Sequence, residues 1–578
     1  MAALDNEDAS KFVQLSRRGT GGEPAGAGLF PKLRILLIGL YTERYPAVGE
    51  THGLSVVAAS LEQAFPESLE EIRIVDLVAF GSEDLVPVIA QMEAFRPNVV
   101  GVSVPYGTYS TLLELAPNLR SLLDEGACVM LGGALPTYLG DRMLIDVDPR
   151  VVVIIGEGEE ASVGVVSAWA GRFEFSVVPN LRVAVNGTSL ATKRSLVDVT
   201  KVPAPYRAHL PGILASGAQV FAESSRACSW AACSFCLRGL TDIDGKPREF
   251  RRFGKQRLFD DLKRLSDLGV TAVTFADEDF LGGQLHEIEN FADVLEETVQ
   301  AIAPRRLAFD ASVTIRSIYY SDDIESERFR RKAVLRRFVS MGLRKIFLGV
   351  ESGSASQLRR YTKGHTPDEC AAASREVLSA GAKLELGFIM FDPLCTRPEI
   401  IENVRFLLDN DLAQFASSPT AELRMQVGSR YLGILHKAEA QLGTELYDRE
   451  LDPNTLSYRY RFADADVAEL AHAVRRDNAR RQALVYRLKG LTRFGDGKIL
   501  GVSTNEVGAL LGQYRTRMLE ALAQAALATN VSYEIEAKKA LLDLASSVLG
   551  VNGLDNHSAP LVRQAVEIAR ELVCAAIS

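Results

Sequence analysis

The sequence has few of the features that mark secreted, membrane-spanning and nucleic-acid-binding proteins. Only 7 of its 578 residues are cysteine, and four of these are scattered, unlike a disulfide framework. No uninterrupted apolar run reaches the roughly 18 residues that a membrane-spanning helix needs. The 65 basic and 74 acidic residues give a net charge of -9, which does not favour a nucleic-acid backbone as partner. We therefore expect neither nucleic acid nor membrane as a partner.

The beginning of the chain also lacks an apolar segment. Its first thirty residues are polar and contain the run RRGTGGEPAGAG, so they lack the hydrophobic core of a secretory signal. We expect residues 1–29 to form a disordered tail and the protein to be cytoplasmic. A chain of 578 residues is too long for one hydrophobic core, so several domains are expected.

Short apolar runs alternate with amphipathic stretches from residue 33 onward. The runs LRILLIGL, IRIVDL, NVVGVSV, CVMLGG and VVVII have strand length and many β-branched residues, as is typical of buried parallel strands. Residues 30–172 are therefore predicted to form a doubly wound, Rossmann-like α/β domain. Ligands of such domains bind at the carboxyl ends of the strands. Glycines there let a bulky ligand approach the backbone, and they are Gly132, Gly133, Gly156 and Gly158.

A predicted hairpin separates this domain from a second α/β series. Residues 173–215 contain two alternating runs with a turn expected at Asn186 and Gly187. Residues 216–427 contain six strand-like runs: AQVFAES, TAVTFADEDF, LAFDASVTI, KIFLGVESG, KLELGFIMF and ELRMQV. They predict a partial (β/α)6 barrel with its chemistry at the carboxyl ends of the strands. Residues 428–578 are predicted to form a mostly helical domain.

Three cysteines lie close together after the first barrel strand. Cys228, Cys233 and Cys236 have the spacing C-x4-C-x2-C, which lets thiolates converge on one metal or cluster. A structural zinc site needs four protein ligands, and no histidine lies close by in the sequence. Three thiolates on a four-iron cluster leave one iron open, so a substrate-binding iron–sulfur cluster is the favoured interpretation. Zinc and a coincidental grouping of cysteines stay open as alternatives.

Several stretches form an ordered set of motifs. SSRACSWAACSFC is followed by VTFADEDFLGG, GVESGSASQLRRYTKGHT and AGAKLELGFIMFDP, and the N-terminal domain contains GGALPTY and IIGEGEEA. In this order they resemble the cluster loop, the strand motifs and the cobalamin signature of radical S-adenosylmethionine enzymes with an N-terminal cobalamin-binding domain. The resemblance covers about residues 33–430. Two positions differ from the common pattern, because one extra residue separates Cys228 from Cys233 and Phe391 replaces a frequent glycine.

The resemblance implies that the three cysteines hold a [4Fe-4S] cluster whose open iron binds S-adenosylmethionine. Reductive cleavage of that ligand gives methionine and a 5'-deoxyadenosyl radical. The residues implied to bind S-adenosylmethionine are Phe235, Ala276, Asp277, Ser312, Arg316, Glu351 and Ile389. The alternatives are ordinary packing for Phe235 and Ile389, a solvated acidic turn for Asp277, Glu278 and Asp279, and surface ion pairing for Arg316.

The resemblance also implies cobalamin at the strand ends of the N-terminal domain. The residues implied to hold it are Ser103, Tyr106, Gly132, Gly133, Thr137, Gly156 and Glu157. The motif D-x-H-x-x-G, which supplies an axial imidazole in other cobalamin proteins, is absent, and His52 is the only histidine of this domain. Cobalamin is therefore expected to bind base-off, without a histidine ligand. A domain that binds another nucleotide, or nothing, is the alternative.

The activity implied by the resemblance is C-methylation of an unactivated aliphatic or heteroaromatic carbon, with methylcobalamin as intermediate. A tailoring step in antibiotic biosynthesis is the favoured context. The implied partners are a small-molecule or carrier-tethered intermediate and an electron donor such as flavodoxin or ferredoxin. Radical rearrangement, ring contraction or cyclisation without methyl transfer is the first alternative, and a non-enzymatic cobalamin or metal sensor is the second. Candidates for substrate contact, with aromatic packing as the alternative, are Tyr447, Tyr458 and Tyr460.

Overall fold

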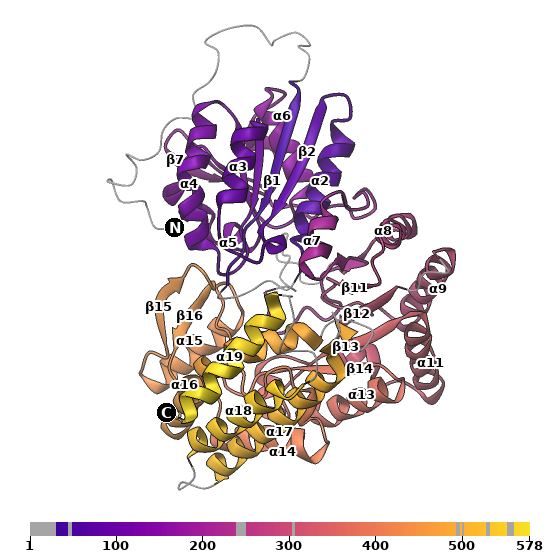
Figure 1. Ribbon diagram of the computed structural model, residues 1–578, viewed down its shortest axis with the longest axis vertical. Coiled ribbons are helices and arrows are strands. Elements are labelled where there is room, and N and C mark those ends of the chain that lie inside the picture. The colour runs from indigo at the N-terminus through magenta and orange to yellow at the C-terminus, as the bar shows by residue number, and fades with distance from the viewer. Residues whose placement is uncertain are drawn as a thin grey trace. The chain divides into compact units, whose positions relative to one another are not determined.

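The structure is a computed structural model, and the parts of the chain that it describes form two compact units (Figure 1). The described residues are 31–43, 49–237, 250–302, 307–492, 498–499, 502–527, 532–551 and 560–577. The predicted tail, residues 1–29, lies outside them. The first unit comprises Met1–Ser224, Thr241–Val270 and Leu451–Ser457. The second comprises Ser225–Leu240, Thr271–Glu450 and Tyr458–Ser578.

A seven-stranded sheet forms the centre of the first unit, in the order β2-β1-β3-β4-β5-β6-β7. Its parallel strands are β1 (Leu33–Gly39), β2 (Leu69–Asp76), β3 (Val99–Ser103), β4 (Cys128–Gly132) and β5 (Val152–Ile154). The antiparallel strands β6 (Leu181–Val185) and β7 (Thr188–Ala191) come from the predicted hairpin. Strands β1, β3, β4 and β5 are almost fully buried, as their apolar sequences predict, whereas the edge strand β2 is partly exposed. The doubly wound α/β architecture is thus confirmed.

Helices connect the strands of the first unit. They are α2 (His52–Ala64), α3 (Val86–Phe95), α4 (Tyr109–Asp124), α5 (Ala134–Asp146), α6 (Glu159–Trp169), α7 (Leu210–Ser216) and α8 (Lys255–Asp267). Apolar residues of α2 and α6, such as Leu61 and Val165, pack with Ile35 and Leu37 of β1 in one core. This packing fixes the helices against the sheet, so the loops at the carboxyl ends of the strands have a rigid support. The short strands β8 (Phe221–Ala222) and β10 (Arg251–Arg252) also belong to this unit.

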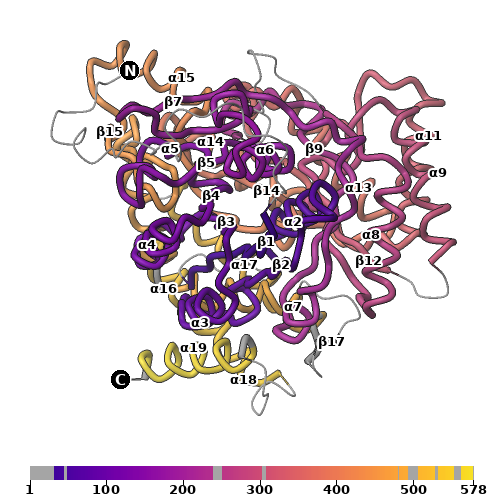
Figure 2. The backbone as a smooth tube through the Cα atoms, turned by 90° about the horizontal axis from the view of Figure 1, so that it is seen from above, coloured from indigo at the N-terminus to yellow at the C-terminus, as the bar shows by residue number. Residues whose placement is uncertain are grey.

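Parallel strands also form the main sheet of the second unit. In the order β14-β13-β12-β11, they are β11 (Ala272–Phe275), β12 (Ala308–Val313), β13 (Leu343–Glu351) and β14 (Lys383–Phe388). Their helices are α9 (Leu285–Ala301), α10 (Ile315–Ile318), α11 (Glu325–Met341), α12 (Ala355–Arg360), α13 (Pro367–Ser379) and α14 (Arg397–Asp409). Helices α9 and α11 lie side by side in both views (Figure 1, Figure 2). The parallel connections place all the carboxyl ends of these strands at one edge of the sheet.

The sixth predicted barrel strand, ELRMQV, is not a regular strand. Its residue Glu422 forms an isolated parallel bridge with Phe391. Further along, the carbonyl of Met425 accepts a hydrogen bond from the N–H of Tyr458, at 2.9 Å. The backbone therefore turns from the barrel strands to another partner after a few residues, which shortens the pairing.

The C-terminal region is mostly helical, as predicted. Its helices are α15 (Tyr431–Leu442), α16 (Ala465–Thr492), α17 (Thr504–Leu527), α18 (Tyr533–Leu549) and α19 (Pro560–Ile577). Short strands occur at β15 (Tyr447–Asp452), β16 (Ser457–Tyr460), β17 (Lys498–Ile499) and β18 (Val502–Ser503). Helix α17 packs against α14, α16 and α18. None of the helices in the described parts of the chain combines the length and apolarity required to cross a membrane.

Candidate active site

The three predicted cluster ligands lie in one loop of the second unit, directly after β9 (Ser225–Arg226). Cys228, Cys233 and Cys236 are partly buried free thiols. Burial raises the pKa of Cys228 to about 12, and the charges of Asp279 and Cys233 contribute to this shift. No group of three or more His, Cys, Asp or Glu side chains is arranged as a metal site within the described residues. Cluster binding by these thiols therefore stays a prediction.

The backbone of this loop is strained on both sides of Cys228. Ala227 has a φ of 65° and Ala231 a φ of 46°, which places both alanines in the left-handed region. That conformation costs an L-residue roughly 1–2 kcal/mol. Such strain persists only where the surrounding structure enforces it, and it is concentrated at functional sites.

Ser234, between the second and third cysteines, is held by hydrogen bonds from several directions. Its N–H donates to the carbonyl of Tyr361 at 2.9 Å, and its carbonyl accepts from the N–H of Tyr431 at 2.8 Å. Its hydroxyl donates to the carbonyl of Arg360 at 2.9 Å. The ring of Phe235, next to Cys236, packs edge-on against the ring of Tyr361 with centroids 5.4 Å apart. The loop is thereby fixed to the segment after β13.

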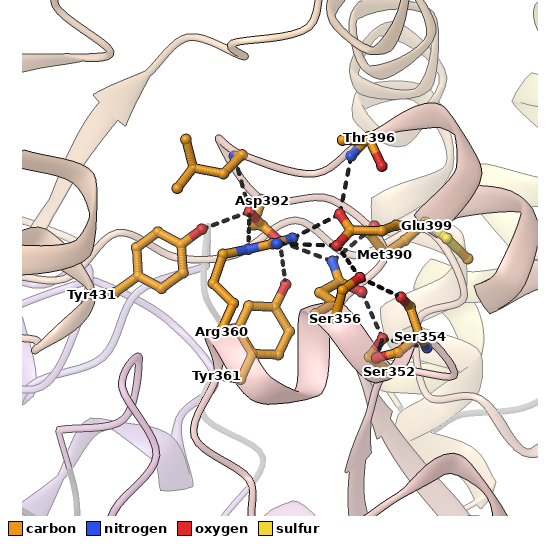
Figure 3. Close-up of polar contacts among 12 residues, drawn as sticks. Ser352, Ser354, Ser356, Arg360, Tyr361, Met390, Asp392, Thr396, Glu399 and Tyr431 are labelled. Carbon is orange, nitrogen blue, oxygen red and sulfur yellow. Dashed lines mark hydrogen bonds and ion pairs between the residues drawn. The ribbon is translucent and has the colours of Figure 1, made fainter. Parts of the chain in front are cut away.

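A buried carboxylate connects the three residues that hold Ser234. Asp392 is 0% exposed, and its oxygens accept from the hydroxyls of Tyr361 at 2.8 Å and Tyr431 at 2.5 Å (Figure 3). The guanidinium of Arg360 donates to it at 2.8 and 3.1 Å, and also donates to Glu399. Burial raises the pKa of Asp392, but Arg360 and the hydroxyl donors outweigh it and hold that pKa below its ordinary value. Sequence reasoning missed this residue, although it directly follows the fifth predicted strand.

The acidic turn after β11 is not a solvated surface. Asp277 is 2% exposed and accepts from the hydroxyl of Ser225 at 2.5 Å. Asp279 is 0% exposed and accepts from the hydroxyl of Ser229 at 2.5 Å. The two aspartates therefore tether the cysteine-loop segment, while Ala276 is exposed and Glu278 half-buried beside them.

Glu351, at the end of β13, lies close to the second cysteine. Its φ is 68°, and its carboxylate is 3.4 Å from the Nζ of the buried Lys363. Burial lowers the pKa of Lys363, but the charges of Cys233 and Glu351 outweigh it and raise that pKa above its ordinary value. The N–H of Ile389 donates to the carbonyl of Glu351 at 2.7 Å. Glu351, Ile389 and the cysteine loop are thus brought together. The motif GVESGSASQLRRYTKGHT includes Lys363, but sequence reasoning gave it no role.

Arg316 contacts the cysteine loop and the segment after α12. Its guanidinium lies over the ring of Trp230, 4.3 Å from the centroid, and donates to the carbonyl of Gly364 at 2.6 Å. The indole of Trp230 donates to the carbonyl of Thr362 at 2.9 Å. Ser312, at the end of β12, accepts at its carbonyl from the N–H of Phe280 at 2.9 Å.

In the first unit, the predicted cobalamin residues gather at the carboxyl ends of β3, β4 and β5. The hydroxyl of Thr137 donates to the carbonyl of Gly133 at 2.8 Å and accepts from the N–H of Gly156 at 3.0 Å. Gly132 pairs with Ser103 in the sheet. Gly133 has a φ of 99°, and an added Cβ would lie 3.3 Å from the hydroxyl of Ser103, so only glycine suits this position.

Other polar residues of the first unit are already engaged with protein groups. The carboxylate of Glu157 accepts from Arg251 at 2.6 and 3.0 Å and from the N–H of Val197 at 2.8 Å. The ring nitrogens of His52 lie 3.7 Å from Glu50 and 3.9 Å from Glu223, and its side chain is 11% exposed. Tyr106 is half-buried. Glu157 therefore organises protein segments, and His52 is confined between carboxylates.

The three tyrosines proposed for substrate contact pack against one another and their neighbours. Tyr447 is 6% exposed and meets Tyr458 edge-on, with centroids 5.3 Å apart. The hydroxyl of Tyr460 donates to Glu422 at 3.2 Å. All three belong to or pack on a core that includes Ile389 and Tyr431. Aromatic packing thus accounts for their positions.

Residues 40–166 match the family described as B12 binding domain. The chain is 24% identical over 363 residues to 4'-phospho-dehydrooxetanocin synthase of Priestia megaterium, covering 60% of this chain and 47% of that protein. It is 26% identical over 324 residues to hopanoid C-3 methylase of Methylococcus capsulatus, covering 54% of this chain and 56% of the relative. The chain thus spans about half the length of these two curated relatives.

Two solved structures resemble most of this chain. The cobalamin-dependent S-adenosylmethionine radical enzyme OxsB, with aqua-cobalamin bound, matches with a TM-score of 0.75 and 19% identity over 94% of this chain and 80% of OxsB. The radical S-adenosylmethionine methyltransferase TsrM from Kitasatospora setae, with cobalamin and a [4Fe-4S] cluster bound, matches with a TM-score of 0.58 and 15% identity. That match covers 86% of this chain and 99% of TsrM. The chain therefore contains a B12-binding domain and has the fold of the cobalamin-dependent radical S-adenosylmethionine enzymes, as the order of its motifs predicts.

Proposed function

We propose that this protein is a cobalamin-dependent radical S-adenosylmethionine C-methyltransferase that acts on an unactivated aliphatic or heteroaromatic carbon of a natural-product intermediate. The observation that carries this proposal is a B12-binding domain in the same chain as a strained three-thiol loop beside Glu351 and Lys363. The similarity to hopanoid C-3 methylase and to the methyltransferase TsrM supports methyl transfer over other uses of the same fold.

The residues of the loop suit a [4Fe-4S] cluster. Burial raises the pKa of both Cys228 and Cys233, so these thiols keep their protons unless nearby positive charge stabilises the thiolates. The ammonium of Lys363 supplies part of that charge, because it lowers the pKa of Cys233 against the effect of burial. The iron ions of a bound cluster would supply the rest. Three protein thiolates leave one iron of a four-iron cluster open for S-adenosylmethionine.

Bound cofactors supply the radical and the methyl group, and the protein positions them and excludes water. Asp277 and Asp279 hold the start of the cysteine loop through Ser225 and Ser229. Glu351 stands at the end of β13, where its carboxylate can accept hydrogen bonds from the hydroxyl or amino groups of a bound nucleoside or amino acid. The guanidinium of Arg316 is a bidentate donor suited to a carboxylate.

In the first unit, a Cβ added at Gly132 would meet nothing closer than Ile154, at 4.0 Å, which supports a close approach of a large flat ligand to the backbone at the end of β4. Thr137 ties the loops after β4 and β5 together, which keeps that surface in one arrangement. His52 lies between Glu50 and Glu223 at the start of α2, which supports base-off binding of cobalamin without a histidine ligand. The proposal further requires an electron donor of flavodoxin or ferredoxin type and a small-molecule or carrier-tethered substrate.

A second function, radical rearrangement or cyclisation without methyl transfer, is favoured by a separate observation. OxsB has the higher TM-score of the two structures, and the curated relative with 24% identity is named a synthase and not a methylase. Both functions consume S-adenosylmethionine, so the products formed from it separate them.

The deciding experiment measures the fate of S-adenosylmethionine. The full-length protein is reconstituted anaerobically with iron, sulfide and cobalamin, reduced, and incubated with S-adenosylmethionine. A methyltransferase forms both S-adenosylhomocysteine and 5'-deoxyadenosine, and a converted substrate gains one methylene in mass. A rearrangement enzyme forms 5'-deoxyadenosine without S-adenosylhomocysteine, which would contradict the proposed methyl transfer.

A further inference from the structure

A pocket lies in the second unit, at the end of the barrel strands opposite the cysteine loop. It is lined by residues 417–419, α16 and α17, and has a volume of about 220 Å³. Ser417, at its edge, donates its hydroxyl to Glu385 at 2.8 Å, and Glu385 is near the beginning of β14. Ile389, beside the candidate active site, follows the carboxyl end of the same strand. The pocket is therefore separate from the site proposed above.

Every charged residue among those that line the pocket is cationic: Arg481, Lys489 and Arg515. Two of the cations have carboxylate partners. The Nε of Arg481 lies 3.3 Å from Asp477, and the Nζ of Lys489 lies 3.3 Å from Glu385. Neither carboxylate lines the pocket, and Glu385 also lies 3.4 Å from the Nζ of Lys345, so the lining keeps an excess of positive charge.

Among these three cations, Arg515 has the fewest partners that compensate its charge. Its Nη1 donates to the carbonyl of Gln414 at 3.0 Å, but its Nε is buried without a hydrogen-bond partner among the described residues. Burial lowers the pKa of this guanidinium, and the charge of Glu385 offsets only part of that effect. A guanidinium nevertheless stays protonated in proteins. Arg515 as a whole is half-buried, and incomplete pairing of a charge that is partly withdrawn from water is costly, so a bound anion would reduce that cost.

The neutral residues around Arg515 also suit an anion. Asn478, Gln482 and Ser418 carry amide or hydroxyl donors, and Tyr486 adds an aromatic ring that is 49% exposed. The volume exceeds the roughly 30 Å³ share of one water molecule several-fold, so it has room for a phosphate and part of an attached group. Guanidinium groups bind phosphate oxygens through paired hydrogen bonds, which favours phosphate over a halide.

We propose that this pocket binds a phosphate-bearing small molecule and that the guanidinium of Arg515 pairs with the negatively charged phosphate. The proposal goes beyond the proposed methyl transfer, because it needs neither cluster nor cobalamin. Free phosphate and a nucleoside monophosphate both carry the phosphate group that the pocket would bind. The relative affinities of the pocket for these two ligands show which of them it prefers.

Isothermal titration calorimetry of the full-length reconstituted protein with inorganic phosphate and with AMP, at constant ionic strength, tests the proposal. We expect saturable binding to the wild type, and Arg515→Gln should raise the dissociation constant about tenfold or more. Arg517→Gln is the matched control, since Arg517 lies on the same helix, pairs with Asp543 and does not line the pocket. Tighter binding of AMP than of phosphate points to a nucleotide, and the reverse order to free phosphate.

Two results would overturn the proposal. One is an absence of saturable binding of either ligand to the wild type, and the other is unchanged affinity in Arg515→Gln. If Arg515→Gln does not fold, Arg515→Lys keeps the charge and loses the paired donors, so its affinity should fall less. A rise of the wild-type melting temperature with phosphate, compared with chloride of equal ionic strength, reports binding without any variant.

Discussion

At the scale of single residues, Asp392 determines how firmly the cysteine loop is attached to the barrel. Its carboxylate accepts from Arg360, Tyr361 and Tyr431 (Figure 3). Each of these three residues also bonds to Ser234 through its backbone. Asp392→Asn keeps the shape of the side chain but removes the charge that balances Arg360. We expect the unfolding free energy to fall by about 3 kcal/mol, because a buried ion pair is broken from one side.

Asp392→Asn should also make the cysteine loop more mobile within the folded protein, in addition to lowering the free energy of unfolding. In cofactor-free protein well below the unfolding transition, the thiols of Cys228, Cys233 and Cys236 should react faster with a disulfide reagent. Asp368→Asn, in the exposed first turn of α13, is the control and should leave the thiol kinetics unchanged. Equal thiol kinetics in wild type and Asp392→Asn would show that Asp392 supports the fold without positioning the loop.

Asp392 also predicts a pH dependence of stability. An aspartate in an unfolded chain has a pKa of about 3.9. In the folded protein, the pKa of Asp392 lies below its ordinary value, because the effect of burial, which raises the pKa, is outweighed by Arg360 and the hydrogen-bond donors that stabilise the carboxylate. Its contribution to stability is therefore complete above the unfolded pKa and is lost as the pH falls through the folded pKa. Urea unfolding of the cofactor-free protein between about pH 7 and pH 3 should show a difference between wild type and Asp392→Asn that shrinks below pH 4. A constant difference would contradict this assignment.

Residue roles were predictable where a motif names them and not where distant residues meet. Phe235, Glu351 and Ile389 were predicted to bind S-adenosylmethionine, and that role stays a prediction. The structure places Glu351 and Ile389 close to the cysteine loop that contains Phe235. Asp392 and Lys363 were missed, because their importance comes from partners that only the folded chain places around them. Asp392, for example, meets Tyr431 across 39 positions of sequence.

At the scale of elements, the strand-end loops of the first unit form the candidate cobalamin surface. Thr137→Val keeps the volume of the side chain but removes the hydroxyl that joins Gly133 to Gly156. We expect the affinity for hydroxocobalamin to fall roughly tenfold, because the loops lose their common anchor and the N–H of Gly156 loses an acceptor. Equilibrium dialysis measures this change. Thr188→Val, on the exposed strand β7, is the control, and an equal affinity in the two variants would refute the role of Thr137.

Regular elements were predicted well, since their signals are local. The apolar runs of the first unit all became strands. Those of β1, β3, β4 and β5 are buried, because parallel strands covered on both faces need apolar side chains throughout, whereas β2 lies at the sheet edge and is partly exposed. The run ELRMQV looked equally strand-like but forms only an isolated bridge at Glu422, because its later backbone bonds to Tyr458. The sequence pattern of a segment does not reveal which backbone it will pair with.

At the scale of the whole molecule, the order of the motifs predicted the fold better than the overall sequence identity to proteins of known structure would have done. The chain is only 19% identical to OxsB, yet the two folds correspond over 94% of this chain. Packing constraints preserve an architecture through many substitutions, whereas substrate choice depends on a few side chains that no motif marks. The substrate class and the cofactor-binding residues accordingly rest on proposal, while the comparisons show the B12-binding domain and the fold.

The most direct test of the central claim is the iron content and low-temperature EPR spectrum of the anaerobically reconstituted, reduced protein. The account predicts about four irons for each chain and a cluster signal that changes when S-adenosylmethionine is added. Cys233→Ala should lose both the iron and the change, whereas Cys574→Ala, at an exposed cysteine, should keep both. Full iron content and an unaltered response to S-adenosylmethionine in Cys233→Ala would contradict the account.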